Sequence, residues 1–167
     1  MPIQPTLKKK DAVLYAGIRL RVQRDQLGQS VPIALEALSN FFTQHHLAST
    51  APPLVRYFVV DYNDGSVDAD VGFPVSSASI PAHPRIHLGQ LPSGTYATLD
   101  HHGSYETLVK TTSSLLDWAK QTGTRWNVAT ENNVTWWAAR VEHYIAGPEQ
   151  DPSPENWLTE IAILLAD

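Results

Sequence analysis

The sequence predicts an α+β domain built from two modules of order β-α-β-β, with the helices on one face of an antiparallel sheet. Two observations support this. Segments in which apolar and polar residues alternate, typical of half-buried strands, are separated by segments with apolar residues at helical spacing. The same order of elements then occurs twice within 167 residues. Because sequence identity between the halves is weak, the duplication is inferred from element order.

The first module is expected to span about residues 11–80, after an N-terminal tail of residues 1–10 that carries three lysines. Its elements are expected as a strand at 12–22, a helix at about 30–47, and strands at 54–60 and 67–75. Ser30 is the expected helix N-cap, with Pro32 in the first turn, where its missing N–H costs little. The Asn63–Ser66 turn separates the last two strands.

The second module is expected to span about residues 81–167 and repeats this order. Its elements are expected as strands at 85–91 and 95–101, a helix opened by Gly103-Ser104, and strands at 134–145 and 157–165. Gly123 stands where a helix C-cap is expected, because glycine adopts the left-handed conformation readily. The two modules together form a single domain over residues 11–167.

Composition excludes several classes of protein. The net charge is −5, from 12 Lys+Arg and 17 Asp+Glu, whereas a surface that follows phosphates carries a basic excess. We therefore expect no direct nucleic-acid binding. The chain has no cysteine, which removes disulfides, thiolate nucleophiles and cysteine-zinc sites. No apolar run approaches the roughly 20 residues of a membrane span, so we expect no membrane partner and a cytoplasmic location.

No cofactor or metal is expected. The i,i+4 pair His83 and His87 has the spacing of helical metal ligands, but Pro81 and Pro84 disfavour a helix there. The sequence contains no glycine-rich phosphate loop and no Gly-x-Ser-x-Gly nucleophile motif.

The segment 134–145 holds the candidate binding site. Alternation places Trp136, Arg140, Glu142 and Tyr144 on one face of this strand. Glu160 has apolar neighbours on its own face of the last strand. If the two strands pair, Glu142 and Glu160 are expected to face one aromatic-lined concavity. The alternative is that Glu142 pairs with Arg140 on a wet sheet surface.

Carboxylates among aromatic rings favour a cationic or flat aromatic ligand. The rings supply contact area and a cation–π attraction of roughly 0.5–2 kcal/mol, and the carboxylate supplies the complementary charge. Two carboxylates close together in an apolar place would also raise the pKa of at least one of them, which would permit a general base.

A set of short segments, in this order and spacing, resembles the GyrI-like small-molecule-binding domain, the effector-binding domain of multidrug-responsive regulators. The resemblance covers about residues 11–165. The segments are Asp61-Tyr62, Asp70, Gly72–Val75, Leu91–Ala97, His102–Leu108, Leu116–Trp118 with Gly123, Glu142–Tyr144 and Trp157–Ile161.

This resemblance implies two modules related by a pseudo-twofold axis, with a ligand groove on the sheet face away from the helices. It also implies that a glutamate on each of the last two strands contacts cationic lipophilic compounds. The glutamates at the matching positions are Glu142 and Glu160. The aromatic candidates for the same site are Tyr144, Trp136 and Tyr96.

The resemblance leaves three functions open. The first is a stand-alone protein that senses or sequesters aromatic, possibly cationic, toxic compounds; about ten residues precede the first strand, too few for a DNA-reading domain. The second is a hydrolase of cyclopropane-containing DNA-alkylating natural products, with Glu142 or Glu160 acting on a water. The third is a protein-interaction module that inhibits DNA gyrase through its acidic surface.

Overall fold

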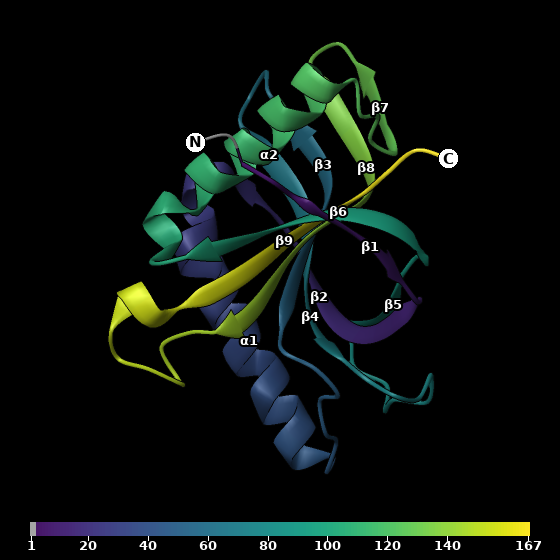
Figure 1. Cartoon of the computed structure of the whole chain (residues 1–167). Helices are drawn as coiled ribbons and strands as arrows, with labels where there is room; N and C mark the ends of the chain where they lie inside the picture. Colours follow the sequence, from purple (N-terminus) through teal and green to yellow (C-terminus); the bar gives the residue numbers. More distant parts are fainter. Residues whose placement is uncertain (1–2) are drawn as a thin grey trace.

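The computed structural model describes residues 3–167 and shows one strongly curled antiparallel sheet with two helices (Figure 1). Three short 3-10 turns complete the secondary structure. The strands are β1 (Thr6–Lys10), β2 (Val13–Gln23), β3 (Leu54–Asp61), β4 (Ser66–Pro74), β5 (Ile86–Leu91), β6 (Gly94–His102), β7 (Val128–Glu131), β8 (Val134–Ala146) and β9 (Leu158–Leu164). The helices are α1 (Leu27–Gln44) and α2 (Leu108–Thr122).

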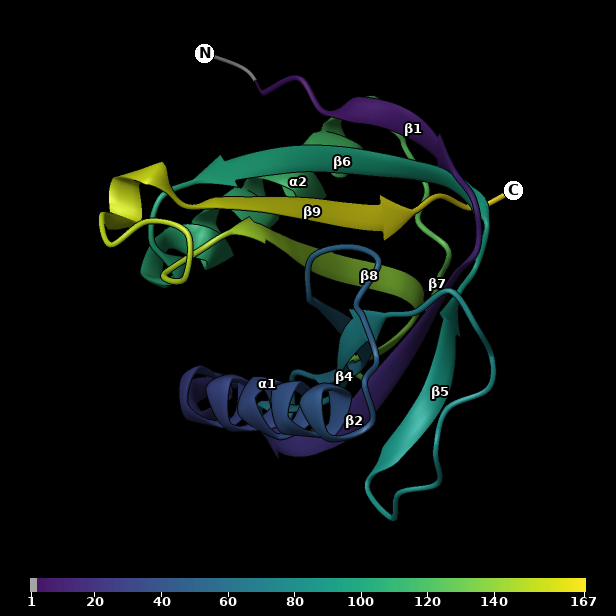
Figure 2. The same ribbon diagram turned by 90° about the horizontal axis from the view of Figure 1, so that it is seen from below.

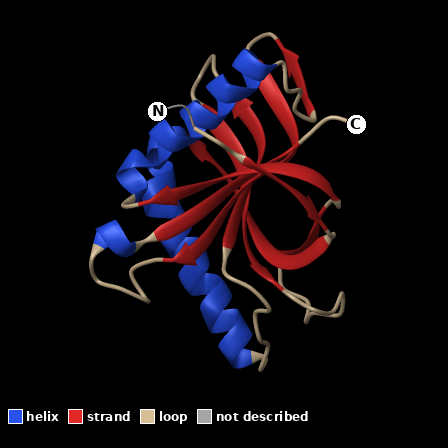
Figure 3. Cartoon of the chain, in the orientation of Figure 1, coloured by secondary structure: helices blue, strands red, loops and turns tan. Residues whose placement is uncertain are grey.

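The strand order confirms the α+β class and the two-module architecture. Across the sheet it is β1-β6-β9-β8-β3-β4-β2-β5, with β7 paired to β8. From one edge the order is β1, β6, β9, β8, and from the other edge it is β5, β2, β4, β3. In both cases an outer strand is followed by the first, the last and then the middle strand of a module. The outer strand of each module comes from the segment that precedes the other module, since β1 pairs with β6 and β5 pairs with β2. Figure 3 shows the helices on one side of the curled strands.

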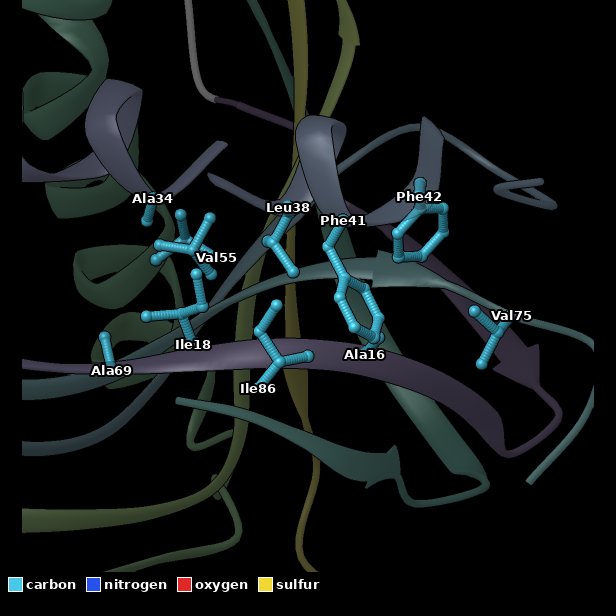
Figure 4. Close-up of a cluster of buried hydrophobic side chains, with 11 residues drawn as sticks. Ala16, Ile18, Ala34, Leu38, Phe41, Phe42, Val55, Ala69, Val75 and Ile86 are labelled. Atoms are coloured by element: carbon cyan, nitrogen blue, oxygen red, sulfur yellow. The ribbon is translucent and has the colours of Figure 1, made fainter. Parts of the chain in front are cut away.

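Helix α1 covers the first module through an apolar face. Leu38, Phe41 and Phe42 pack with Ile18 of β2 and Val55 of β3 in one buried cluster (Figure 4). Helix α2 packs in the same way on the second module, where Leu115 contacts the cluster that includes Ile161 and Ile163. Burial of these side chains supplies most of the stabilisation of both helices.

The opposite face of the sheet encloses a second core, centred on Tyr15. Its ring lies on a platform of three glycines on neighbouring strands, Gly17, Gly72 and Gly89. A Cβ at Gly72 would lie 2.5 Å from a ring carbon of Tyr15. Glycine is therefore required here by the close approach of the ring.

Within that core, Asp70 is a buried carboxylate with three side-chain partners. Tyr15 donates a 2.6 Å hydrogen bond and Arg19 Nε a 2.7 Å hydrogen bond, and His87 Nε2 lies 3.0 Å away. Burial alone would raise the pKa of Asp70, but these three partners outweigh it and lower the pKa. Burial raises the pKa of Tyr15 well above its ordinary value, and the charge of Asp70 and its hydrogen bond with Tyr15 add to the increase. His87 thus contacts the buried Asp70 carboxylate within the sheet.

The N-terminal tail and the start of the first helix differ from expectation. Thr6–Lys10 form β1 and pair with β6, so these residues belong to the sheet rather than to a tail; residues 1–2 lie outside the described residues. Helix α1 begins at Leu27 after a 3-10 turn at Arg24–Gln26, which places Ser30 inside the helix rather than at its N-cap.

The second half shows one strand that the sequence did not predict. Strand β7 has only four residues and is joined to β8 by Asn132-Asn133, both in the left-handed conformation that suits a tight hairpin. Gly123 ends α2 with φ 70°, which confirms the predicted C-cap. No helix among residues 3–167 is long and apolar enough to cross a membrane.

Candidate functional site

A cavity of about 980 Å³ lies between α1 and α2, over the central strands β3 and β8. Leu27, Val31 and Leu35 of α1 line one side, and Val109 and Leu116 of α2 line the other. Figure 2 shows the two helices on either side of this central region. The cavity therefore lies on the helix-covered face, and the expectation of a groove on the face away from the helices is wrong for this cavity.

The cavity floor is formed by alternate residues of β8. Arg140, Glu142 and Tyr144 share this face, as the alternation predicted, and all three line the cavity with Tyr57 of β3. Tyr144 also contacts the buried clusters beneath both helices, so it lies where the two modules meet.

Two phenol groups hold the Glu142 carboxylate. Tyr144 donates a 2.8 Å hydrogen bond and Tyr57 a 3.1 Å hydrogen bond, both to Oε1, so that neither hydroxyl is used on Oε2. Burial raises the pKa of Glu142 above the ordinary glutamate value, although these hydrogen bonds and the charge of Arg140 oppose the increase. Burial also raises the pKa of both tyrosines, so they remain protonated donors.

Arg140 is held by aromatic rings rather than by a carboxylate. Its guanidinium carbon lies 4.9 Å from the ring centroid of Trp137 and 5.5 Å from that of Tyr57. Nη1 is buried without a hydrogen-bond partner in the described chain. The ion pairs found in residues 3–167 do not include Arg140, so the alternative in which it pairs with Glu142 on a wet surface is not what the structure shows.

Aromatic side chains cluster at one end of the cavity. Tyr105, just before α2, lies edge-on to Tyr144 with ring centroids 5.4 Å apart and is 5.0 Å from the ring of Trp157. Gly147 leaves room for Tyr105, since a Cβ there would lie 2.6 Å from the tyrosine oxygen. These rings offer flat apolar area beside the Glu142 carboxylate.

Glu160 lies on the opposite face of the sheet from Glu142, so the prediction that the two share one concavity is wrong. The register of β8 and β9 pairs His143 with Glu160 and Glu142 with Ile161, and directly paired residues lie on the same face. Glu160 forms ion pairs with Lys8 Nζ at 2.7 Å and with Lys10.

These two lysines of β1 explain the electrostatics around Glu160. Burial would raise the pKa of Glu160, but the hydrogen bonds from Lys10 and Lys8 outweigh it and lower the pKa. Burial, with a further contribution from Lys10, lowers the pKa of the neighbouring His143 to about 4. Glu160 is thus neutralised by two lysines of β1, which the sequence analysis placed in an N-terminal tail.

Two further predicted site residues also lie outside the cavity. Tyr96 is buried on the face of Glu160, where its hydroxyl donates a 2.7 Å hydrogen bond to the Pro92 carbonyl. Trp136 is 43% exposed and does not line the cavity. Glu142 and Tyr144 are therefore the members of the predicted set that the structure brings together.

Sequence reasoning missed Tyr57 and Tyr105 as cavity residues. Tyr57 was detectable in principle, because it occupies a strand position two residues from Val55 and so faces the same side. Tyr105 lies in a 3-10 turn, Tyr105–Thr107, which has no alternation to reveal its direction. No group of three or more His, Cys, Asp or Glu side chains within the described residues is arranged to hold a metal ion.

Comparison with known proteins identifies the family. The model of the GyrI-like small molecule binding domain matches residues 3–166, so the chain belongs to this family. No curated protein matches the chain in sequence.

Several solved structures share the fold. The EcmrR C-terminal domain is 20% identical, with a TM-score of 0.74, and the match covers 100% of this chain and 99% of that one. In the EcmrR–DNA complex the chain spans 57% of the EcmrR chain at 20% identity, with 98% of this chain covered and a TM-score of 0.75. SAV2435 bound to tetraphenylphosphonium is 15% identical, with a TM-score of 0.63 and coverage of 98% and 94%. A hydrolase from Listeria innocua is 12% identical, with a TM-score of 0.59 and coverage of 98% and 92%.

Proposed function

We propose that the cavity between α1 and α2 binds aromatic or lipophilic small molecules, including cations, and that the protein senses or sequesters such compounds. The observation that supports this most directly is the Glu142 carboxylate, fixed by two tyrosines inside an apolar cavity of about 980 Å³. That volume lies at the upper end of the range for small-molecule sites.

The chemistry of the cavity suits this class of ligand. Aromatic rings at one end supply contact area, and Oε2 of Glu142 supplies an acceptor that neither tyrosine uses. A cation that contacts this carboxylate recovers electrostatic attraction that is stronger in an apolar cavity than in water. A ligand of this kind, tetraphenylphosphonium, is bound by SAV2435, which shares the fold.

Matched arginine substitutions test where a lipophilic cation binds. Val109 of α2 is exposed and lines the cavity, whereas Ile33 of α1 is exposed and does not line it. We expect Val109→Arg to weaken tetraphenylphosphonium binding at least tenfold, because it adds bulk and positive charge at the cavity. Ile33→Arg carries the same added charge and should bind like wild type. Isothermal titration measures both, and equal affinity of the two variants would place the ligand elsewhere.

Hydrolysis of an electrophilic, cyclopropane-bearing aromatic compound is a second candidate, favoured by the raised pKa of Glu142. A buried carboxylate of raised pKa is suited to accept a proton from a water molecule as that water attacks the strained ring carbon. The ring C–C bond then breaks, its electron pair moves into the conjugated ring system of the substrate, and the proton returns from Glu142 to the resulting anion, so that the product has gained one water. Incubation with such a compound followed by mass spectrometry would show a gain of one water that Glu142→Gln abolishes. Recovery of unchanged compound after long incubation with wild type would leave binding as the function.

A further inference from the structure

Five charged residues among residues 3–167 line the cavity: Arg24, Glu36, Arg140, Glu142 and Glu149. Arg24, which precedes α1, lies over the Tyr62 ring at 5.4 Å, beyond the end of β3. At the opposite end, burial and, to a smaller extent, the charge of Glu149 raise the pKa of Tyr105, which packs against Tyr144. All of these residues line the cavity. Arg24 and Glu149 therefore place opposite charges at opposite ends of the cavity, and Glu36 of α1 adds a further negative charge to its lining.

The register of β3 and β8 places Arg140 and Glu142 in the same order between these ends. Tyr57 pairs with Arg140, and Val55 pairs with Glu142, so the guanidinium lies nearer the Tyr62 end of β3. Beyond Glu142, the Tyr144 amide donates a hydrogen bond to the carbonyl of Pro53, just before β3. Tyr144 therefore lies one step further toward the end of the cavity that holds Glu149. Arg140 and Glu142 are two residues apart, about 7 Å along the strand.

Both central charges keep hydrogen-bonding capacity that their side-chain partners in residues 3–167 do not use. The buried Nη1 of Arg140 has no hydrogen-bond partner in residues 3–167. A buried donor without an acceptor costs free energy, so a ligand that supplied an acceptor here would recover that cost. Glu142 uses only Oε1 for the two tyrosines. The rings of Trp137 and Tyr57 fix the guanidinium plane without consuming its N–H groups.

We infer that the preferred ligand is amphoteric: a flat aromatic molecule with a carboxylate that accepts hydrogen bonds from Arg140 and a cationic group that contacts Glu142. This inference rests on the proposed function and narrows its ligand class. A pure lipophilic cation would satisfy Glu142 but would leave Arg140 without an acceptor and place two positive charges close together. An amphoteric ligand satisfies both groups, and its own dipole is aligned with that of the cavity.

Two rhodamine dyes that differ in one group test this inference. The first is a zwitterionic rhodamine with a free benzoate, and the second is its methyl ester, a pure cation of nearly the same size. We expect wild-type protein to bind the free benzoate at least tenfold more tightly, the value of one charge-assisted hydrogen bond. Arg140→Met, which keeps an unbranched apolar stem, should bring the affinity ratio to one or below. Fluorescence anisotropy measures both affinities.

Arg21→Met provides the matched control, because Arg21 is an exposed arginine on the other face and lines no part of the cavity. It should keep the wild-type ratio. If wild type binds both dyes equally, or Arg140→Met keeps the preference, the inference is wrong while the proposed function stands. If neither dye binds wild type, the proposed function fails and this inference with it. The wild-type ratio decides the matter even if Arg140→Met does not fold.

Discussion

Glu142→Gln is expected to weaken tetraphenylphosphonium binding by about tenfold to a hundredfold, measured by isothermal titration above the raised pKa of Glu142. The substitution keeps the size of the side chain and an oxygen that Tyr57 and Tyr144 can reach, but it removes the negative charge. A charge-assisted contact contributes about 1.5–3 kcal/mol, which corresponds to this change in affinity.

The same variant removes a pH dependence. Since burial raises the pKa of Glu142, wild-type protein should begin to lose affinity for the cation, as the pH falls, at a higher pH than an ordinary glutamate would require. Glu142→Gln should show weak, pH-independent binding over that range. Glu160→Gln is the matched control on the opposite face, and its affinity should equal that of wild type. Equal losses in the two glutamine variants would contradict the assignment of the site.

Asp70→Ala is expected to lower the free energy of unfolding by about 3 kcal/mol, measured by urea denaturation. The change leaves the buried Tyr15 hydroxyl and the guanidinium of Arg19 without their acceptor. Removing one partner of a buried pair is costly because the remaining group stays desolvated. Since the folded-state pKa of Asp70 is lowered, its stabilisation is present above the ordinary aspartate pKa and is lost as the pH falls through the folded-state value.

Asp68→Ala provides the control for Asp70. Asp68 is two residues away on β4. Its carboxylate lies 3.5 Å from Nε of Arg21, and the Arg21 side chain is 75% exposed. Such a surface pair contributes about 0–1 kcal/mol. If Asp70→Ala and Asp68→Ala destabilise the protein equally, the buried network does not stabilise the sheet as described.

The local pattern of the sequence was enough for most elements and for one face of β8. Alternation correctly placed Arg140, Glu142 and Tyr144 together, because the side-chain period of a strand is a local property. Gly123 was recognised as a C-cap for a similarly local reason. Strand β1 was missed because its Lys8-Lys9-Lys10 run shows no alternation, and only its pairing with β6 makes it a strand.

The relation between the two glutamates could not be predicted from the sequence. Whether Glu142 and Glu160 share a face depends on the register of β8 against β9, and a shift of one residue exchanges the faces. That register is fixed by pairing between β8 and β9 and by the packing of the whole sheet, not by the local pattern of either strand. Trp136 and Arg140 illustrate a second limit, since the register between β3 and β8 shifts between them and strict alternation no longer applies.

The exchange of outer strands between the modules has a consequence for how the chain can be divided. A cut near residue 80 would leave each half with a solvent-exposed sheet edge and without the strand that covers it. Neither half is a complete folding unit, so we infer that separated halves would associate with each other by mutual strand complementation. A protein made of one such half alone could cover its exposed sheet edge in the same way only by forming a homodimer in which the two copies exchange outer strands. The symmetry of the sheet thus has the form of a dimer whose two subunits are joined in one polypeptide.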